Sequence, residues 1–231
     1  MIGIFIAFSI FFSWLIALTL ALTQVQLTGL YSILHYAWLV FFIQFLFVGI
    51  FITVHDACHG SVSPRYPSIN LWIGRTFAFI YAGLIFDTLQ KKHAKHHLHS
   101  GTHLDPDFHQ EGRSSLIFWL LRFSKQYVSV RQILTMCVFA QILMHGFHLA
   151  EINVFAFWVA PSLLSSLQLF YFGTYLPHRK LKNLTFTDRH HTRNFKIPFF
   201  ASWISCYHFG AFHHRHHLKP RLAWFQLSKN E

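Results

Sequence analysis

Charged side chains are scarce in this chain of 231 residues, where Asp, Glu, Lys and Arg together make up 12%. A typical soluble domain carries about 25%. Apolar residues reach 53%, including 28 Phe and 7 Trp. This composition excludes an ordinary soluble domain and indicates an integral membrane protein.

Cysteine is scarce as well, and nothing marks a second domain. Cys58, Cys137 and Cys206 stand alone, without a Cys-x-x-Cys pair. This excludes a disulfide framework and a thiolate metal site. The chain also has no Gly/Ser-rich linker and no long internal repeat. We therefore expect a single domain over residues 1–231.

Lys and Arg are absent from two long parts of the chain, residues 1–64 and 132–178. These parts contain four apolar segments without any charged side chain, at 1–22, 31–54, 132–150 and 152–176. A helix of about 20 residues crosses a hydrocarbon core of about 30 Å, so we expect each segment to span the membrane. The first segment lacks the basic start of a signal peptide and is expected to remain as a spanning helix.

A fifth apolar segment, 71–89, carries Arg75, Gly83 and Asp87, so we expect it to be re-entrant or buried rather than to cross. The loops near 24–30 and 151–153 then share one side of the membrane, and all 19 basic residues lie on the other. This bias predicts that the basic side is cytoplasmic. Topology and anionic lipid explain the net charge of +11, so no nucleic-acid partner is expected.

Histidine is abundant, with 19 residues, and three short motifs have the spacing of metal ligands. They are "HDACH" with His55 and His59, "HAKHH" with His93, His96 and His97, and "HHRHH" with His213, His216 and His217. Residues at i, i+3 and i+4 share one helix face, so we expect the imidazoles of each motif to point at one ion.

Eight imidazoles are too many for one tetrahedral zinc and suit two metals. Imidazole binds Zn, Cu, Fe and Ni, so the ligand type does not select the metal. Soluble di-iron bundles use Glu and Glu-x-x-His ligands, but this chain has only eight acidic residues and no Glu-x-x-His. A di-metal centre here would be almost wholly histidine. The fold predicted is an all-α integral membrane helical bundle with a cytoplasmic histidine-rich cap.

Four stretches of the chain resemble the membrane di-iron oxygenases and desaturases, and within them the bacterial and cyanobacterial beta-carotene ketolases. They are "FITVHDACHGSV" (51–62), "KKHAKHHLHSGTHLDPDF" (91–108), "PSLLSSLQLFYFGTYLPHRK" (161–180) and "CYHFGAFHHRHHLKPRLAWFQL" (206–227). The histidine motifs are shared by the whole superfamily, whereas Asp-Pro-Asp, "FYFGTYLPHR" and "HFG" are ketolase-like. Three positions depart from the family: Cys58 replaces the usual Met, Arg215 an acidic residue and His103 an Asp. None of them removes a motif histidine.

The resemblance implies a fatty-acid-desaturase-like domain that binds two iron ions and uses O2 with an external electron donor. It also implies a ninth ligand, His178. The expected reaction oxidises the allylic methylene at the 4-position of a beta-ionone ring twice, giving a geminal diol that loses water to leave a ketone. The expected partners are a carotenoid, membrane lipid and a ferredoxin-type donor, which the basic face would attract by its charge.

Asp105, Asp107 and His208 are the candidates for residues that act beside the metals. The two aspartates flank Pro106, so they serve either a turn or the N–H of a metal-bound imidazole. Asp56 could act in the same way. His208, with His190 and His191, is assigned either to the surroundings of the metals or to the surface.

The other histidines are expected to lie outside the metal site. His99, His103 and His109 are expected in solvated loops, and His214 is expected to point away from the metals. His35, His145 and His148 fall within the predicted spans, where we expect hydrogen bonds in the core.

Two alternative functions remain open. A carotenoid hydroxylase or a lipid desaturase would use the same scaffold, and the product distinguishes an alcohol or an alkene from a conjugated ketone. A membrane metal transporter is the alternative of another class. It would need polar or acidic pairs inside the spans, which these segments lack apart from His145 and His148.

Overall fold

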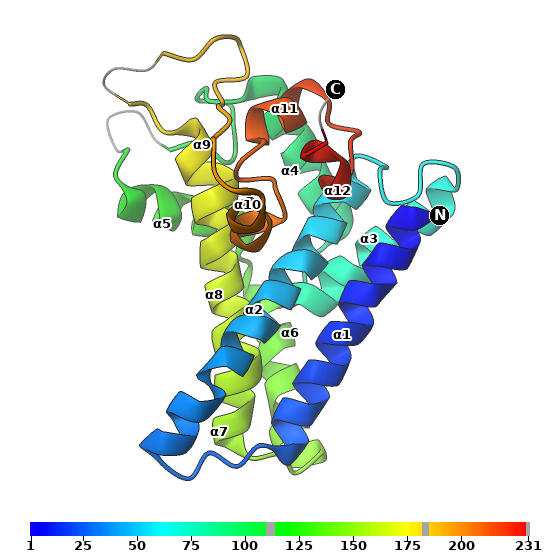
Figure 1. The fold of residues 1–231 in the computed structure, drawn as a ribbon, viewed down its shortest axis with the longest axis vertical. Helices are drawn as coiled ribbons and strands as arrows, with labels where there is room; N and C mark the ends of the chain where they lie inside the picture. Colours follow the sequence, from blue (N-terminus) through cyan, green and yellow to red (C-terminus); the bar gives the residue numbers. More distant parts are fainter. Residues whose placement is uncertain (110–113, 182–184, 230–231) are drawn as a thin grey trace.

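The computed structural model describes residues 1–109, 114–181 and 185–229, and it is built of helices (Figure 1). The α-helices are α1 (Ile2–Gln24), α2 (Leu30–Cys58), α3 (Pro67–Ala82), α4 (Phe86–His99), α5 (Leu116–Tyr127), α6 (Val130–Gln141), α7 (Glu151–Val154), α8 (Ala160–Leu169), α9 (Leu176–His178), α10 (Phe199–Cys206), α11 (His213–Leu218) and α12 (Trp224–Leu227). Three π-helical turns are η1 (Ile142–Gly146), η2 (Phe155–Val159) and η3 (Phe170–Tyr175). The expected all-α fold is confirmed.

Three long helices form the core of the bundle. They are α1, α2 and a continuous helix, Glu151–His178, which contains α7, η2, α8, η3 and α9. They have 23, 29 and 28 residues with mean hydropathies of 2.4, 2.4 and 1.4, so each is long and apolar enough to cross a bilayer. These helices indicate that the protein is associated with a membrane.

Two further apolar segments are bent rather than straight. The axes of α3 and α4 differ by 99°, and that of α5 differs by 83° from the helix formed by α6 and η1. Residues 71–89 therefore do not form one straight helix: Gly83 ends α3 with a φ of 65°, and Arg75 pairs with Asp87 across the bend at 3.1 Å. By length and composition, three helices can cross a membrane, or five if each bent pair is one span.

The segment expected to span at 132–150 is helical only as far as Gly146. Residues 147–150 turn the chain into the long helix, and His148 adopts a φ of 52° there. This turn and the α1–α2 connection lie at one end of the bundle (Figure 1). The ends of α2 and α9 meet α4 and α11 at the other end, so all histidine motifs gather there.

A close contact between α2 and the segment after α10 holds this histidine-bearing end together. Tyr207 adopts a φ of 47° and stacks on Phe45 of α2, with ring centroids 4.6 Å apart. One helical turn further on, a Cβ at Gly49 would lie 2.4 Å from Tyr207 Oη. Only glycine at position 49 leaves room for this tyrosine, which is six residues before His213, the first residue of α11.

A chain of amide groups joins α2, α8 and α10. Gln44 Nε2 donates to Gln168 Oε1 at 2.7 Å, and Gln168 Nε2 donates to the carbonyls of Ile204 and Ser205 at 2.9 and 2.7 Å. Hydrocarbon offers no other partner to such groups, so pairing them inside the protein stabilises the contact.

Candidate metal centre

Five histidines from three helices form the first group of possible metal ligands. They are His55 and His59 at the end of α2, His93 and His97 on α4, and His216 on α11. One ring nitrogen of each lies within 4.8 Å of those of all the others. Successive Nε2 atoms are 2.7 Å apart for His59–His93, 3.2 Å for His93–His97 and 3.0 Å for His97–His216.

Four buried histidines form the second group: His96, His178, His213 and His217. Their Nε2 atoms are 3.2 Å apart for His96–His217, 3.1 Å for His217–His213 and 2.9 Å for His213–His178. All nine histidines named as ligands in the sequence therefore fall into two adjoining groups. The rings of His97 and His217 stack across the two groups with centroids 4.2 Å apart.

These distances suit metal coordination better than hydrogen bonds between imidazoles. A ring nitrogen has one in-plane site, either a lone pair or an N–H. His93 Nε2 and His217 Nε2 each face two other Nε2 atoms, which one site cannot satisfy. Ligands about 2.0–2.1 Å from a common ion lie roughly 3.0–3.4 Å apart, close to the observed spacing. Both groups thus fit a metal ion.

Burial favours the neutral form of His59 and His213, as coordination requires. Burial, with a contribution from nearby His96, lowers the pKa of His213 to about 3 and that of His59 to about 4. Both imidazoles therefore keep a lone pair available at neutral pH.

The structure divides each three-histidine motif between the two groups. On α4, His93 and His97 join the first group while His96 joins the second. On α11 the division is reversed, since His216 joins the first group and His213 and His217 the second. The expectation that each motif faces one ion is therefore corrected. Positions i+3 and i+4 differ by about 100° around a helix axis, so a helix lying between two ions reaches both.

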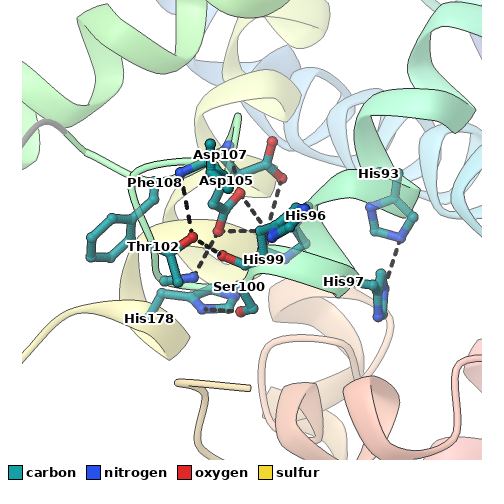
Figure 2. Close-up of polar contacts among 12 residues, drawn as sticks. His93, His96, His97, His99, Ser100, Thr102, Asp105, Asp107, Phe108 and His178 are labelled. Atoms are coloured by element: carbon teal, nitrogen blue, oxygen red, sulfur yellow. Dashed lines mark hydrogen bonds and ion pairs between the residues drawn. The ribbon is translucent and has the colours of Figure 1, made fainter. Parts of the chain in front are cut away.

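Asp105 is the direct partner of a ligand. Its two carboxylate oxygens lie 2.9 and 3.0 Å from His96 Nδ1, and they also accept the backbone N–H groups of Gly101 and Asp107. Figure 2 shows both aspartates beside His96, with the His93–His97 pair to one side. A carboxylate at Nδ1 holds the tautomer in which Nε2 is free for the metal.

The carboxylate of Asp107 lies further from His96 than that of Asp105 does. Its Oδ2 is 3.7 Å from His96 Nδ1, whereas its Oδ1 accepts a hydrogen bond from the hydroxyl of Tyr127. Trp119 Nε1 donates to the Asp107 carbonyl. Burial raises the pKa of Asp107 to about 6, although His96 nearby draws it down.

His178 is oriented by a backbone carbonyl that sequence analysis did not identify. Its Nδ1 lies 3.0 Å from the His191 carbonyl oxygen, so the N–H of Nδ1 donates there and Nε2 faces His213. His191 adopts a φ of 46°, and its own Nδ1 pairs with the Ser100 carbonyl. No sequence signal marks a carbonyl as a partner, because every residue has one.

His208 does not join either group. It is 2% exposed, its Nδ1 lies 2.9 Å from Ser202 Oγ, and its ring packs on Phe199 and Trp224. With a φ of 69°, it forms the turn that leads towards α11. These contacts favour a structural role over a role beside the metals.

Asp56 and His214 are engaged elsewhere. Asp56 Oδ2 accepts the Trp224 N–H at 3.1 Å, while its Oδ1 is 3.8 Å from His55 Nδ1. His214 Nδ1 lies 3.0 Å from Thr192 Oγ1. His190 approaches the site, with its ring centroid 5.7 Å from that of His217.

Several other histidines differ from their expected environments. His109 was expected to be solvated but is 8% exposed and packs against Phe108 and Trp119. His35, His145 and His148 were expected in the core, yet all three are exposed on the surface of the bundle. His103 is exposed in a loop, as expected, whereas His99 is partly exposed and is the last residue of α4 rather than a loop residue.

A large apolar cavity leads to the metal centre. Its volume is about 830 Å³, and its walls come from α2, α5, α6 and the helix Glu151–His178. His55, His93, His96, His213 and Asp107 line its inner end. Gly173 also lines it, and a Cβ there would meet no atom within 4 Å, so the cavity is wide beside the ligands.

Comparison with known proteins decides the family. A beta-carotene ketolase of Paracoccus sp. (strain PC1) is 38% identical over 224 residues, covering 96% of this chain and 88% of that protein. The chain belongs to the beta-carotene ketolase family. A beta-carotene ketolase of Paracoccus sp. (strain N81106 / MBIC 01143) is 40% identical, covering 80% of this chain and 74% of that protein.

More distant relatives agree with this membership. The zeaxanthin 4-ketolase of Chlamydomonas reinhardtii is 36% identical over 82% of this chain and 42% of its own length. Residues 31–134 match the fatty acid desaturase family. No solved structure matches the chain significantly. The resemblance inferred from the histidine motifs is confirmed, and with it the expectation of an oxidoreductase.

The histidines of residues 91–109 are expected to differ sharply in their effects. Replacing His93, His96 or His97 by Ala removes one ring nitrogen from a group of candidate ligands. Each change should therefore lower the amount of bound metal and abolish ketone formation. His99→Ala and His103→Ala are matched controls from the same segment and should retain most activity. Metal analysis and pigment chromatography of the five variants provide the measurement. Equal damage from His103→Ala and His96→Ala would show that the loop itself reaches the metals.

Asp105→Asn and Asp107→Asn should separate the two carboxylates. Asp105 contacts His96 directly, so its loss of charge should lower metal affinity or activity roughly 10- to 100-fold. Asp107→Asn should have a smaller effect on affinity, because the carboxylate of Asp107 is paired with Tyr127. Titration with a chelator, followed by metal analysis, ranks the two variants. If Asp105→Asn bound metal as tightly as the wild-type protein, Asp105 would serve only to form the turn.

Proposed function

We propose that the protein is a beta-carotene 4-ketolase, which converts the methylene at the 4-position of a beta-ionone ring into a ketone. The observation that carries this proposal is the position of the nine histidines, which form two groups able to hold metal ions at the inner end of an apolar cavity. The names of relatives that are 36–40% identical support the same reaction.

The two ions are proposed to be iron. One ion would be held by His55, His59, His93, His97 and His216. The other would be held by His96, His178, His213 and His217. All nine donors are imidazoles, which iron accepts, and membership of a desaturase-like family supports the choice. Bound iron would supply the activation of O2 that C–H oxidation needs, with electrons from an external donor.

The protein's own contribution is to place the substrate and keep water away. A carotenoid is a long apolar rod, and apolar side chains dominate the cavity walls. The wide part beside Gly173 can receive an end-ring and bring its 4-methylene towards the ligands. Since that C–H bond is allylic, it is weaker than its neighbours, and placement decides which carbon reacts.

The ketone arises from two oxidations at one carbon. Each consumes one O2, two electrons and two protons, puts one oxygen atom on carbon and releases the other as water. The resulting geminal diol loses water to give the ketone. A hydroxylase would stop after the first oxidation, so the cavity must hold the alcohol in place for the second.

The remaining alternatives predict different products and metals. Co-expression in a bacterium that produces beta-carotene, followed by pigment chromatography, separates a conjugated ketone from an alcohol. Detergent-purified protein should contain two tightly bound irons per chain. Exchangeable zinc without any pigment change would instead support a metal transporter, and an unsaturated lipid product would support a desaturase.

We further propose a multi-pass topology with the metal centre on the cytoplasmic face. The two connections at the opposite end of the bundle carry no Lys or Arg, whereas the parts of the chain with all 19 basic residues, 65–131 and 179–231, include the loops around the metals. Apolar side chains exposed on α1 and α2, such as Phe5, Phe12, Trp38 and Phe41, are proposed to contact lipid.

Electron transfer from an acidic donor such as a ferredoxin should depend on salt. Complementary charge accelerates association with the basic face, and dissolved ions screen it over about 8–10 Å. Turnover with limiting donor should therefore fall as ionic strength rises, while turnover with saturating donor serves as the control and should change little. A rate that is indifferent to salt under both conditions contradicts an electrostatically guided donor.

A further inference from the structure

The apolar cavity is elongated along the helix Glu151–His178. Its lining residues follow the helix Glu151–His178 from Phe155 to Thr174, which corresponds to roughly 28 Å at about 1.5 Å per residue. Dividing the cavity volume of about 830 Å³ by this length gives a mean cross-sectional area of roughly 30 Å². Such a channel suits an extended rod, and it runs through most of the thickness of a bilayer.

The two ends of the channel have different walls. Gly173 and Thr174 lie at the metal end with His213, whereas Met144, Phe155 and Trp158 lie at the far end. The far-end residues belong to the π-helical turns η1 and η2 or directly adjoin them, and Gly173 and Thr174 belong to η3. Turns of this kind interrupt the regular ladder and are frequent where a ligand is bound.

One polar side chain in the far half of the channel has no partner. Gln141 lines the cavity on α6, three residues before Met144, and its amide makes no hydrogen bond within residues 1–109, 114–181 and 185–229. The amide nitrogens of Gln44, Gln168 and Asn153 donate hydrogen bonds inside the bundle, whereas the side-chain amides of Gln132 and Gln141 in the cavity wall make none among the described residues. An amide without a partner is unfavourable in hydrocarbon, and the exposed amide of Gln141 is free to donate to a ligand that carries a polar atom.

We propose that the far end of the channel is a second ring seat, in which the Gln141 amide donates a hydrogen bond to the oxygen of an end-ring that has already been oxidised. This inference rests on the proposed ketolase function. A two-ringed substrate lies along the channel, with one ring at the metals and the other beside Met144, Phe155 and Trp158. After the first ketone forms, the molecule re-enters in the reverse direction, and Gln141 then favours the second ketone.

Gln141→Leu tests this seat, because leucine keeps the bulk and removes the amide. Gln132→Leu is the matched control, since Gln132 lines the same channel on the same helix but lies roughly 13 Å closer to the metal end. Binding of beta-carotene and of its 4,4′-diketone to detergent-purified protein is followed by quenching of tryptophan fluorescence, which does not require turnover. Pigment chromatography of producing cells gives the ratio of diketone to mono-ketone.

The seat predicts a selective change. Gln141→Leu should weaken binding of the diketone about five-fold, the effect of one hydrogen bond, and leave binding of beta-carotene unchanged. Mono-ketone should accumulate in cells. Gln132→Leu should change neither the affinity ratio nor the product ratio, and equal detergent-solubilised yields of both variants establish that they fold.

Two results would overturn the proposal. In the first, Gln141→Leu changes the affinities for beta-carotene and for the diketone by the same factor, or changes neither affinity. That result would assign the Gln141 amide to the lipid headgroup region. In the other, Gln132→Leu produces the same selectivity change. Failure of the proposed function is a separate result, because wild-type cells would then form no ketone at all, whereas failure of the ring seat leaves ketone formation intact.

Discussion

Nine imidazole nitrogens directed at two points inside an apolar bundle are the constraint on which the rest of the structure depends. Neutral imidazoles this close cannot all hydrogen-bond with one another, since each ring nitrogen has a single site. Two cations satisfy all of them at once. Because such a site does not exist in the unfolded chain, the free energy of metal binding also stabilises the fold.

The helices are arranged to meet this constraint from several directions. The end of α2 contributes two candidate ligands and α9 contributes one, while α4 and α11 lie between the two groups and each contribute to both. The sharp bend after α3 turns α4 into this position. Outside the ligands, Asp105 and the His191 carbonyl each hold one imidazole in the tautomer that leaves Nε2 free. The apolar cavity reaches the same histidines, so an apolar molecule inside it would lie beside both groups.

Much of this arrangement of helices and histidines was predictable from local patterns in the sequence. The apolar runs and the i, i+3, i+4 spacing of histidines depend only on helix geometry, so they identified the long helices and the residues that gather at their ends. The ninth histidine, His178, was implied by a family motif. Properties that depend on contacts between distant segments were not predictable. The division of His93 and His96 between two groups, the carbonyl that orients His178 and the burial of His109 all depend on the positions of other helices.

The contact between Gly49 and Tyr207 has a consequence for the order in which the protein is made. His213, His216 and His217 follow every long helix in the chain, and the ribosome synthesises them last. Both groups of candidate ligands stay incomplete until α11 is in place and Tyr207 packs against α2 beside Gly49. A chain in which α11 is not yet in place therefore offers six of the nine imidazoles, and one helix of six residues completes both groups.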